Sequence, residues 1–360
     1  MRVVALASYP ERMASTRFRV SRYLPHLAAR GIDVRLVSAL DDVAAASLYA
    51  PGGALKMARA AVEGVGRQIA ALARGSDVVW VQREALLAGP PLVEALATAR
   101  GLRIVLDYDD AIWIAQGSAL RRATRFAWKF DWVLRRAVHA TAGSERLADR
   151  ARALGVPATV LPTAVEREVW TPGEASSWSA DPMQPLVIGW VGTHTTAPQL
   201  ALVAPALRKL RADGHRFRVL IIGAGSGFRL EGVEIETRAW ALEREIDDFR
   251  AIDIGVTPML STPWHEGKCG FKQVQFMAVG VPFVSSLVGG ARDFLVHEQN
   301  ALVAHAEDDW YVQLRRLLVE AELRSRLASA GRALVEQRLC IEVQADTLAR
   351  VLRDAANPPS

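Results

Sequence analysis

Two lysines among glycines are the first feature of this 360-residue chain that indicates chemistry. The segment 265–290, HEGKCGFKQVQFMAVGVPFVSSLVGG, passes from a glycine-containing loop into a helical pattern, an apolar strand and a Gly-Gly loop. A helix preceded by glycines offers free N–H groups and a positive dipole end to an anion. Lys268 and Lys272 add charge suited to a diphosphate, and Gln275 lies on the helix face that would reach a ribose. The alternative is an ordinary loop with two solvated lysines.

Aspartates form a second cluster in the run DYDDAIW, residues 107–113, which follows an apolar strand pattern. The Asp-x-Asp spacing of Asp107 and Asp109 is that of paired carboxylates that hold a divalent ion against a diphosphate. That metal-dependent interpretation leaves the second half of the chain without a role, so we disfavour it. Capping of a following helix is a further role that suits aspartate.

Other motifs are weak or missing. Gly223, Gly225 and Gly227 resemble a dinucleotide fingerprint, but no helical pattern follows them, so a turn is the better interpretation. The sequence has no nucleophile elbow, no Walker loop and no Cys/His set with metal spacing. We therefore expect no bound metal and no cofactor.

The front half alternates short apolar runs with helical patterns, which predicts a parallel sheet with helices on both faces. Helical spacing is found at Arg19–Arg30 and Ser144–Leu154, which end at glycines suited to helix C-caps, Gly31 and Gly155. The predicted strands are Val3–Ser8, Asp33–Val37, Val78–Gln82, Arg103–Asp107, Ala137–Ala142 and Ala158–Leu161.

The pattern restarts after Thr171–Pro185, a stretch rich in Pro, Ser and Gly that we interpret as a linker. Predicted strands are Leu186–Val191, Arg218–Gly223, Val233–Glu236, Ile254–Pro258 and Pro282–Ser286. Predicted helices are Gln199–Ala212, Glu243–Arg250, Lys272–Val279, Asp308–Gln337 and Ile341–Ala355. Two open βα sheets in tandem fit this pattern, with ligands outside the carboxyl ends of the strands and the two sheets facing each other across a cleft.

Composition agrees with two globular domains. The chain is 51% hydrophobic and 23% charged, so it can bury ordinary cores. No run is long enough for a membrane-spanning helix, and two cysteines make no disulfide framework. We predict a cytoplasmic protein with an N-terminal domain at 1–170, the linker at 171–185, a second domain at 186–340 and a crossover helix and tail at 341–360.

Charge is unevenly distributed along the chain. Residues 1–165 carry 23 Lys and Arg against 14 Asp and Glu, although the whole chain has a net charge of only +5. A basic front half suits an anionic lipid or a phosphorylated acceptor, whereas no nucleic-acid-binding module accompanies it. The basic, aromatic segment Arg121–Arg136 predicts either contact with the inner face of a membrane or burial with arginines at the surface.

The segment 265–290 resembles the donor motif of family 4 glycosyltransferases, in which two glutamates precede Ala-Met-Ala-x-Gly-x-Pro. It is more similar to a branch with Gly-Lys-Cys-Gly-x-Lys-x-x-Gln-Tyr-Met-Ala-x-Gly-x-Pro, and the matching residues are Gly267, Lys268, Cys269, Gly270, Phe271, Lys272, Gln275, Phe276, Met277, Ala278, Gly280 and Pro282. Gln275 replaces the second glutamate, and Gly267 stands where the first is expected, with Glu266 one residue away. An amide can still bond a ribose hydroxyl.

The resemblance implies the GT-B fold, with two Rossmann-like domains and a C-terminal helix that crosses back to the first. Its donor domain would open with the turn Gly192, Thr193 and His194, which approaches a diphosphate through the backbone. Trp240 would stack on the nucleotide base beside Glu245, although core packing of that tryptophan is the alternative. Lys268, Lys272, Gly192 and the helix that begins near Gly270 would stabilise the departing diphosphate.

In the front half, Ser15, Arg17 and Arg19 match the Ser-x-Arg-Phe-Arg pattern of the same branch. The resemblance implies that the two arginines contact donor phosphates or an anionic acceptor, unless they only support a loop. Asp109 and Asp110 would orient or deprotonate an acceptor hydroxyl. Lipid-linked, polysaccharide and small acceptors all remain open.

The resemblance therefore implies a retaining, metal-independent enzyme that moves a sugar from a nucleoside-diphosphate sugar to an acceptor hydroxyl. Two alternatives stay open: a non-catalytic sugar-nucleotide binding protein on the same fold, and a sugar-nucleotide epimerase. Turnover of the donor separates the first alternative from an enzyme, and release of free sugar separates a transferase from an epimerase.

Overall fold

The computed structural model describes residues 1–47, 54–114, 126, 128–173 and 184–357. These residues divide into two compact units, each built on a six-stranded parallel sheet. Unit 1 comprises Met1–Ala164, Gly267–Cys269 and Ile341–Ser360, and unit 2 comprises Val165–Glu266 and Gly270–Cys340. No helix among the described residues is long and apolar enough to cross a membrane.

The sheet of unit 1 has the strand order β2-β1-β3-β4-β5-β6. Its strands are β1 (Arg2–Ala7), β2 (Asp33–Ser38), β3 (Val78–Gln82), β4 (Ile104–Tyr108), β5 (Ala137–Ala142) and β6 (Ala158–Val160). Both faces of the sheet are buried, since Val4 and Leu6 of β1 join one hydrophobic cluster and Val3 and Ala5 join another. The order changes direction at β1, between β2 and β3, and such a switch point is where ligands bind at the carboxyl ends of strands.

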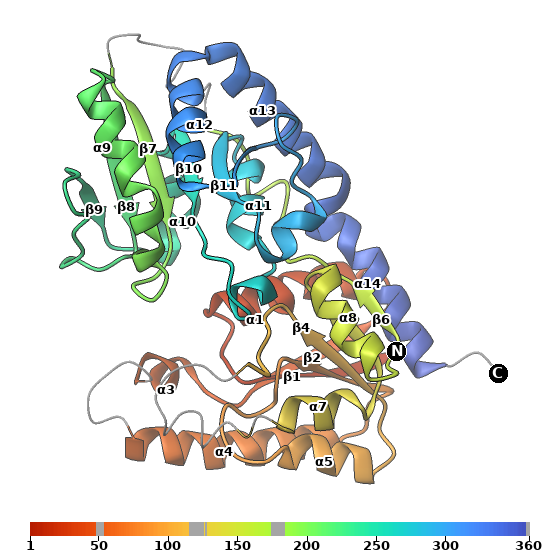
Figure 1. The fold of residues 1–360 in the computed structure, drawn as a ribbon. Helices are drawn as coiled ribbons and strands as arrows, with labels where there is room; N and C mark the ends of the chain where they lie inside the picture. Colours follow the sequence, from red (N-terminus) through yellow and green to blue (C-terminus); the bar gives the residue numbers. More distant parts are fainter. Residues whose placement is uncertain (48–53, 115–125, 127, 174–183, 358–360) are drawn as a thin grey trace. The chain divides into compact units, whose positions relative to one another are not determined.

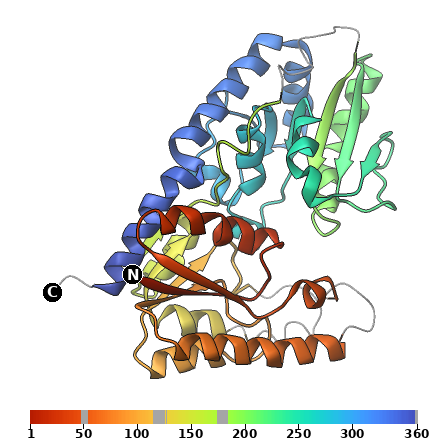
Figure 2. The ribbon, with the colours of Figure 1, turned by 180° about the vertical axis from the view of Figure 1, so that it is seen from behind.

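Helices cover both faces of this sheet. Figures 1 and 2 show α4 and α5 along one face and α14 on the other. The helices of unit 1 are α1 (Ala14–Arg19), α2 (Leu24–Ala28), α3 (Asp42–Ser47), α4 (Ala54–Ala73), α5 (Leu92–Ala99), α7 (Trp128–Leu134), α8 (Glu145–Ala153) and α14 (Ile341–Ala356). Gly31 and Gly155 have φ of 72° and 76°, which suits their place after helices. The predicted continuous helix Arg19–Arg30 is broken, because Val20 leaves the helical region at φ −128°.

The sheet of unit 2 has the order β12-β11-β10-β7-β8-β9 and switches direction at β7. Its strands are β7 (Leu186–Val191), β8 (Phe217–Ile222), β9 (Glu236–Arg238), β10 (Ile254–Thr257), β11 (Phe283–Ser286) and β12 (Leu302–Ala304). Its longer helices are α9 (Ala204–Ala212), α10 (Glu245–Arg250), α11 (Phe271–Ala278), α12 (Glu307–Val319) and α13 (Ala321–Leu334).

Close packing places helix α11 on the sheet of unit 2. A Cβ at Gly255 in β10 would lie 2.8 Å from the ring of Phe276, so the glycine lets this ring approach the strand. Phe276 also packs edge-on to Phe249 of α10 at 4.9 Å and stacks on Phe283 of β11 at 5.9 Å, measured between ring centroids. The start of α11 is thereby fixed near the carboxyl end of the sheet.

The boundary of unit 1 differs from the predicted one. Residues 165–170 belong to unit 2 rather than to the N-terminal domain, because Trp170 is buried against Phe249 and its carbonyl accepts from Arg332. Gly267–Cys269 belong to unit 1, although the sequence predicts them within the second domain. Most of the predicted linker 171–185 lies outside the described residues.

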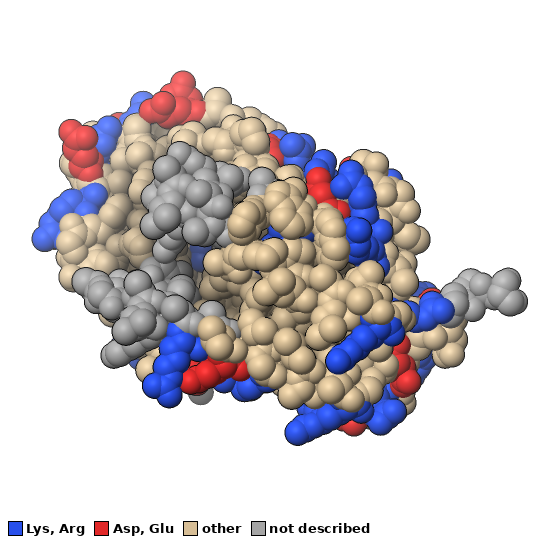
Figure 3. Space-filling model, turned by 90° about the horizontal axis from the view of Figure 1, so that it is seen from below, with Lys and Arg blue, Asp and Glu red and all other residues tan. Residues whose placement is uncertain are grey.

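The segment Arg121–Arg136 is described only from Phe126 onward, with residue 127 left out. Within α7, Phe130, Val133 and Leu134 are buried in the core, and Lys129 is buried as well. The described part of the segment therefore agrees with the burial alternative, except for the exposed residues Phe126 and Trp128. On the face seen in Figure 3, Lys and Arg side chains stand in separate groups around a broad area of uncharged residues.

A buried ion pair ties the strands of unit 1 together at their carboxyl ends. The Arg19 guanidinium at the end of α1 donates from Nε to Asp107 Oδ2 of β4 at 3.0 Å and from Nη1 to the Leu161 carbonyl at 2.6 Å. Thr141 of β5 donates to Asp107 Oδ1 at 2.7 Å. Both charged side chains are fully buried. Burial alone would lower the pKa of Arg19, but the charge and hydrogen bonds of Asp107 outweigh it and raise the pKa.

We expect Arg19→Met to lower the free energy of unfolding by about 3–5 kcal/mol, because it leaves the Asp107 carboxylate buried without its partner. Urea denaturation would measure the loss. The double variant Arg19→Met/Asp107→Asn should recover part of it, and Arg59→Met, at a side chain that is 83% exposed, should change little. A loss below about 1 kcal/mol for Arg19→Met would contradict a structural role for this pair.

Candidate functional site

The carboxyl edge of the sheet in unit 1 gathers charged side chains from three segments. Asp109 and Asp110 follow β4, Arg83 follows β3, and Lys268 comes from the short segment Gly267–Cys269. Lys268 Nζ donates to Asp110 Oδ1 at 2.8 Å, and Arg83 Nη2 lies 3.2 Å from Asp110 Oδ2. The two oxygens of Asp110 therefore each face one cation.

Asp109 differs from its neighbour. Its Oδ1 atom is buried and has no hydrogen-bond partner among the described residues. Burial raises the pKa of Asp109, and the charge of Asp110 raises it further, whereas Arg83 and Arg19 act in the opposite direction. A buried carboxyl oxygen without a partner is costly in a folded protein, so it marks a place where a ligand hydroxyl would be favourable.

Small residues let the segment Gly267–Cys269 pack on this edge. A Cβ at Gly267 would lie 2.2 Å from the Cβ of Ala111, and one at Gly143, after β5, would lie 3.0 Å from both Asp109 Cα and Cys269 Cβ. Cys269 is buried, and burial together with the charges of Asp109 and Asp110 raises the pKa of its thiol to about 12. The thiol therefore stays protonated at neutral pH and acts as a packing group.

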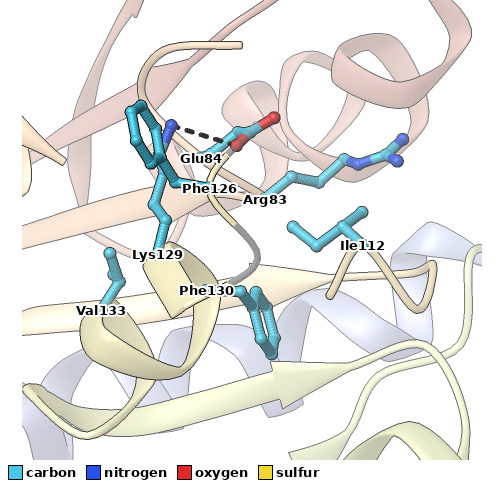
Figure 4. Close-up of a pocket in the computed structure, with 7 residues that line it drawn as sticks. All are labelled: Arg83, Glu84, Ile112, Phe126, Lys129, Phe130 and Val133. Carbon is cyan, nitrogen blue, oxygen red and sulfur yellow. Dashed lines mark ion pairs between the residues drawn. The ribbon is translucent and has the colours of Figure 1, made fainter. Parts of the chain in front are cut away.

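A small cavity adjoins this cluster on the side of α7. Its walls include Arg83, Ile112, Phe126 and Phe130. Figure 4 shows the Arg83 side chain pointing away from the ion pair between Lys129 and Glu84, whose Nζ and Oε2 atoms are 3.1 Å apart. The lysine is also bonded to the Leu86 carbonyl, so this pair fixes the chain that follows β3.

In unit 2, the predicted donor-binding residues come from several turns at the carboxyl edge of the sheet. Gly192 follows β7, and a Cβ there would lie 2.2 Å from the ring of Trp190. Lys272 Nζ lies 6.0 Å from the centroid of the same ring, which brings the start of α11 close to the turn after β7. A Cβ at Gly223, after β8, would lie 2.1 Å from the Gly192 carbonyl oxygen. These turns are thus packed against one another without room for larger residues.

Helix α11 begins at Gly270, which has φ of 79° and no side chain to cap the helix. A Cβ there would lie 3.0 Å from the backbone nitrogen of Ala291, so the glycine also packs on the loop after β11. Phe271 and Lys272 in the first turn are half-buried, and Gln275 is 4% exposed. A helix start of this kind offers its backbone N–H groups to an anion.

Glu266 is held by three donors within unit 2. Its Oε1 atom accepts from Ser261 Oγ at 2.6 Å, and Oε2 accepts from the Gly289 amide at 3.2 Å and from Arg292 Nη1 at 2.7 Å. Burial by itself raises the pKa of Glu266, but these hydrogen bonds together with the charge of Arg292 lower it below its usual value. This carboxylate anchors the Gly289 loop, which is a role the sequence did not indicate.

Several predicted contacts differ from the structure. Arg19 is fully buried in its pair with Asp107, and Arg17 is 4% exposed and donates to the Arg12 carbonyl, so neither guanidinium presents itself to a phosphate. Ser15, beside them in α1, is half-buried. Lys268 forms an ion pair with Asp110 within unit 1, so its charge is offset by that carboxylate. The backbone N–H of Gly192 donates to the Ile222 carbonyl at 2.9 Å, so this amide is not the one that would bind a diphosphate.

Other predicted residues lie where a ligand can reach them. Thr193 and His194 are exposed in the turn after β7. Trp240 follows β9 and is 42% exposed, which contradicts the alternative that it is a core residue. Glu245 begins α10 and is half-buried. Sequence analysis missed Arg83, because no sequence motif indicates its contact with Asp110 or its backbone φ of 64°.

No group of three or more His, Cys, Asp or Glu side chains suited to a metal ion is found among the residues that the structure describes. Within the Asp-x-Asp pair, the Asp107 carboxylate already accepts hydrogen bonds from Arg19 and Thr141. Asp107 is therefore committed to partners within the protein.

Comparison with known proteins adds to this geometry. Residues 185–320 match the family of group 1 glycosyl transferases. A D-inositol 3-phosphate glycosyltransferase from Stackebrandtia nassauensis is 27% identical over 214 residues, which cover 52% of this chain and 47% of that relative. The match thus spans about half the length of the curated relative.

Solved structures show that the fold is that of GT-B glycosyltransferases. Sucrose-phosphate synthase from Thermosynechococcus elongatus is similar with a TM-score of 0.72 and 15% identity, covering 98% of this chain and 99% of that one. Anabaena Alr3699/HepE, in a complex with UDP and glucose, is similar with a TM-score of 0.68 and 14% identity, covering 98% and 99%. Two six-stranded parallel sheets in separate units agree with this fold.

The raised pKa of Asp109 gives a prediction about stability. A carboxyl whose pKa is higher in the folded than in the unfolded chain contributes most stability at low pH, and the contribution is lost as pH rises through the folded pKa. Asp109→Asn removes the charge that is disfavoured there. We therefore expect the variant to have a higher melting temperature than the unmodified protein at pH 8. Each 1 kcal/mol gained in the free energy of unfolding would raise the melting temperature by about 2–4 °C.

Differential scanning fluorimetry between pH 5 and pH 8 would measure this gain, which should shrink toward the acidic end. Asp42→Asn, at an exposed residue of α3, is the matched control and should show no such trend. A variant Asp109→Asn that is less stable than the unmodified protein at pH 8 would mean that the surrounding cations favour the carboxylate more than burial disfavours it.

Proposed function

We propose that this protein is a glycosyltransferase that moves a sugar from a nucleoside-diphosphate sugar to an acceptor hydroxyl. The observation that carries the proposal is the start of α11 within the segment that matches group 1 glycosyl transferases, where Gly270 opens the helix and Lys272 lies beside the turn after β7. Helix N–H groups and a lysine together stabilise the negative charge that develops on a departing diphosphate.

The donor site would use exposed groups of unit 2. Trp240 offers an exposed ring on which a nucleotide base can stack, and Thr193 and His194 lie in an exposed turn. Gln275 lies in α11 and is buried in the protein alone, so the proposal does not depend on its contact with the ribose. UDP is the first nucleotide to test, because a structural neighbour was solved with UDP and glucose.

The acceptor would meet the aspartates of unit 1. The buried Oδ1 atom of Asp109 is suited to accept a hydrogen bond from a hydroxyl, which would orient that oxygen and help to remove its proton. Arg19, Arg83 and Lys268 near it are all paired with carboxylates. We therefore propose that the part of the acceptor that meets Asp109 is a neutral hydroxyl rather than a phosphate.

Metal independence and retention of the anomeric configuration are further parts of the proposal. Asp107 is committed to Arg19, so the Asp-x-Asp run is poorly suited to hold an ion against a diphosphate, and Lys272 with the α11 dipole would supply the charge instead. In the described residues near Asp109 we find no second carboxylate placed as an independent nucleophile, since Asp110 is held by Arg83 and Lys268. The leaving diphosphate would then assist deprotonation on the same face of the sugar.

Nucleotide binding gives the first test. We expect UDP, GDP, ADP or dTDP, one of them preferentially, to raise the melting temperature by a few degrees in the presence of EDTA. Lys272→Ala should abolish the rise, whereas Lys209→Ala, a lysine of α9 that lies over the Tyr311 ring, should keep it. A rise that requires magnesium would favour a metal-dependent site, and the lack of a rise with all four nucleotides would exclude the donor site described here.

Donor turnover tests the reaction itself. Incubated with the nucleotide sugar of the preferred base, the protein should slowly release nucleoside diphosphate and free sugar, with water as the acceptor. Proton NMR of the first sugar formed should show the anomer of the donor if the configuration is retained. The opposite anomer would contradict retention, an isomerised donor would indicate an epimerase, and binding without turnover would indicate a non-catalytic protein.

A further inference from the structure

We propose that Arg83 is a positioning residue for this transfer: with Lys268 it holds Asp110 as a fixed carboxylate, and so leaves Asp109 as the carboxyl that meets the acceptor hydroxyl. The inference rests on the proposed function and adds a residue that no sequence motif indicates. Three features of Arg83 and its surroundings support it, namely its backbone, its side-chain contact with Asp110 and the buried Asp109 oxygen that has no partner in the described part of the chain.

The backbone of Arg83 is unusual and strongly held. Its φ is 64°, in the left-handed region that residues with a side chain seldom adopt. Its N–H donates to the Asp107 carbonyl at 2.6 Å, and the next two residues are fixed by side chains, Glu84 by Lys129 and the Ala85 amide by Glu94 Oε1 at 2.9 Å. Strained conformations that the surroundings enforce in this way are concentrated at functional sites.

The side chain of Arg83 is aimed at Asp110. It is 17% exposed, and its Nη2 lies 3.2 Å from Asp110 Oδ2, while Lys268 Nζ takes the other oxygen at 2.8 Å. The left-handed turn directs the side chain away from the Lys129–Glu84 pair, as Figure 4 shows. A carboxylate with a cation on each oxygen is fixed in orientation.

Asp109 differs from Asp110 in its contacts. Its Oδ1 is buried without a partner in the described part of the chain, while Gly143 and Cys269 close in on its backbone. Two adjacent carboxyls seldom ionise equally, because the charge of one opposes the charge of the other. With Asp110 fixed by two cations, the proton exchanged with an acceptor hydroxyl falls to Asp109.

The charged and titratable groups around the pair come from every neighbouring segment. Asp107 of β4 and Arg19 of α1 lie behind Asp109, and the Cys269 thiol lies beside it. Tyr9 after β1 and Glu84 after β3 act on Arg83, and they favour its charged form together with the two aspartates. Arg83 is the cation whose removal changes the charge at both aspartates and leaves the Arg19–Asp107 pair in place.

The decisive comparison is between Arg83→Gln, which removes the charge, and Arg83→Lys, which keeps it. The pKa values of Asp109 and Asp110 would be measured by carbon-13 NMR on protein labelled at the aspartate carboxyls, with Asp109→Asn and Asp110→Asn to assign the two signals. We expect Arg83→Gln to move the titration of the pair upward by roughly one pH unit or more, because a carboxylate that loses a nearby cation becomes easier to protonate. Arg83→Lys should lie close to the unmodified protein. Arg59→Gln, an exposed arginine of α4, is the matched control and should leave both signals unchanged.

Donor hydrolysis over the same pH range connects this titration to the reaction. We expect Arg83→Gln to lower kcat roughly 10–100-fold with little change in KM for the donor, and to move the acidic limb of the pH–rate profile upward. A variant that is merely destabilised would lose activity without moving this limb. Arg83→Lys should recover most of kcat, because it keeps the charge beside Asp110.

Three results would overturn the inference or its basis, and they are distinguishable. Unchanged carboxyl signals in Arg83→Gln would show that Arg83 does not hold Asp110. Shifted signals with an unmoved acidic limb would reduce Arg83 to a structural residue. Absence of donor turnover in the unmodified protein would instead remove the proposed function on which the inference rests, whatever the carboxyl signals show.

Discussion

The buried pair of Arg19 and Asp107 is the constraint on which the carboxyl edge of unit 1 depends. Two fully buried charges are tolerated only when each is paired and hydrogen-bonded, and here the pair also draws in Thr141 and the Leu161 carbonyl. These contacts join α1 to the ends of β4, β5 and β6. Because β4 ends at Tyr108, directly after this pair, the pair fixes the strand end from which Asp109 and Asp110 follow.

Charge pairing then decides what each aspartate can do. Around the end of β4, Asp107 is paired with Arg19, and Asp110 is paired with both Arg83 and Lys268. Asp109 is the carboxyl without a dedicated cation, and it is also the one whose pKa is raised. A sequence with several aspartates in a row can therefore offer only one carboxyl to a ligand, because the other carboxylates form ion pairs within the protein.

Local patterns predicted most of the fold. Apolar runs of five or six residues located β3, β5 and β7 to the residue, because buried parallel strands are nearly continuous in hydrophobic side chains. Short strands were harder: β12 has three residues and was missed, and β9 begins where the predicted strand ends. The helix predicted from Arg19 breaks at Val20, which a helical pattern of side chains does not register.

The site was less predictable, since its contacts join distant parts of the chain. Lys268 meets Asp110 across 158 residues, and Arg19 meets Asp107 across 88. A sequence indicates that a lysine near glycines suits an anion. It cannot indicate that this lysine forms an ion pair with a distant aspartate in the folded chain. The exposed ring of Trp240 and the neutral role of Cys269 likewise depend on burial, which emerges only when the chain is folded.

These contacts also explain an unusual part of the donor-like motif. In Gly-Lys-Cys-Gly, the first three residues, Gly267–Cys269, pack in unit 1, and only Gly270 starts helix α11 of unit 2. Gly267 has no room for a side chain beside Ala111, and Lys268 is matched to Asp110. Cys269 fills a buried space beside Gly143 and accepts from Thr163 Oγ1 at 3.4 Å. The residue types at these three positions of the motif therefore follow from contacts within unit 1, several of them with the aspartate run.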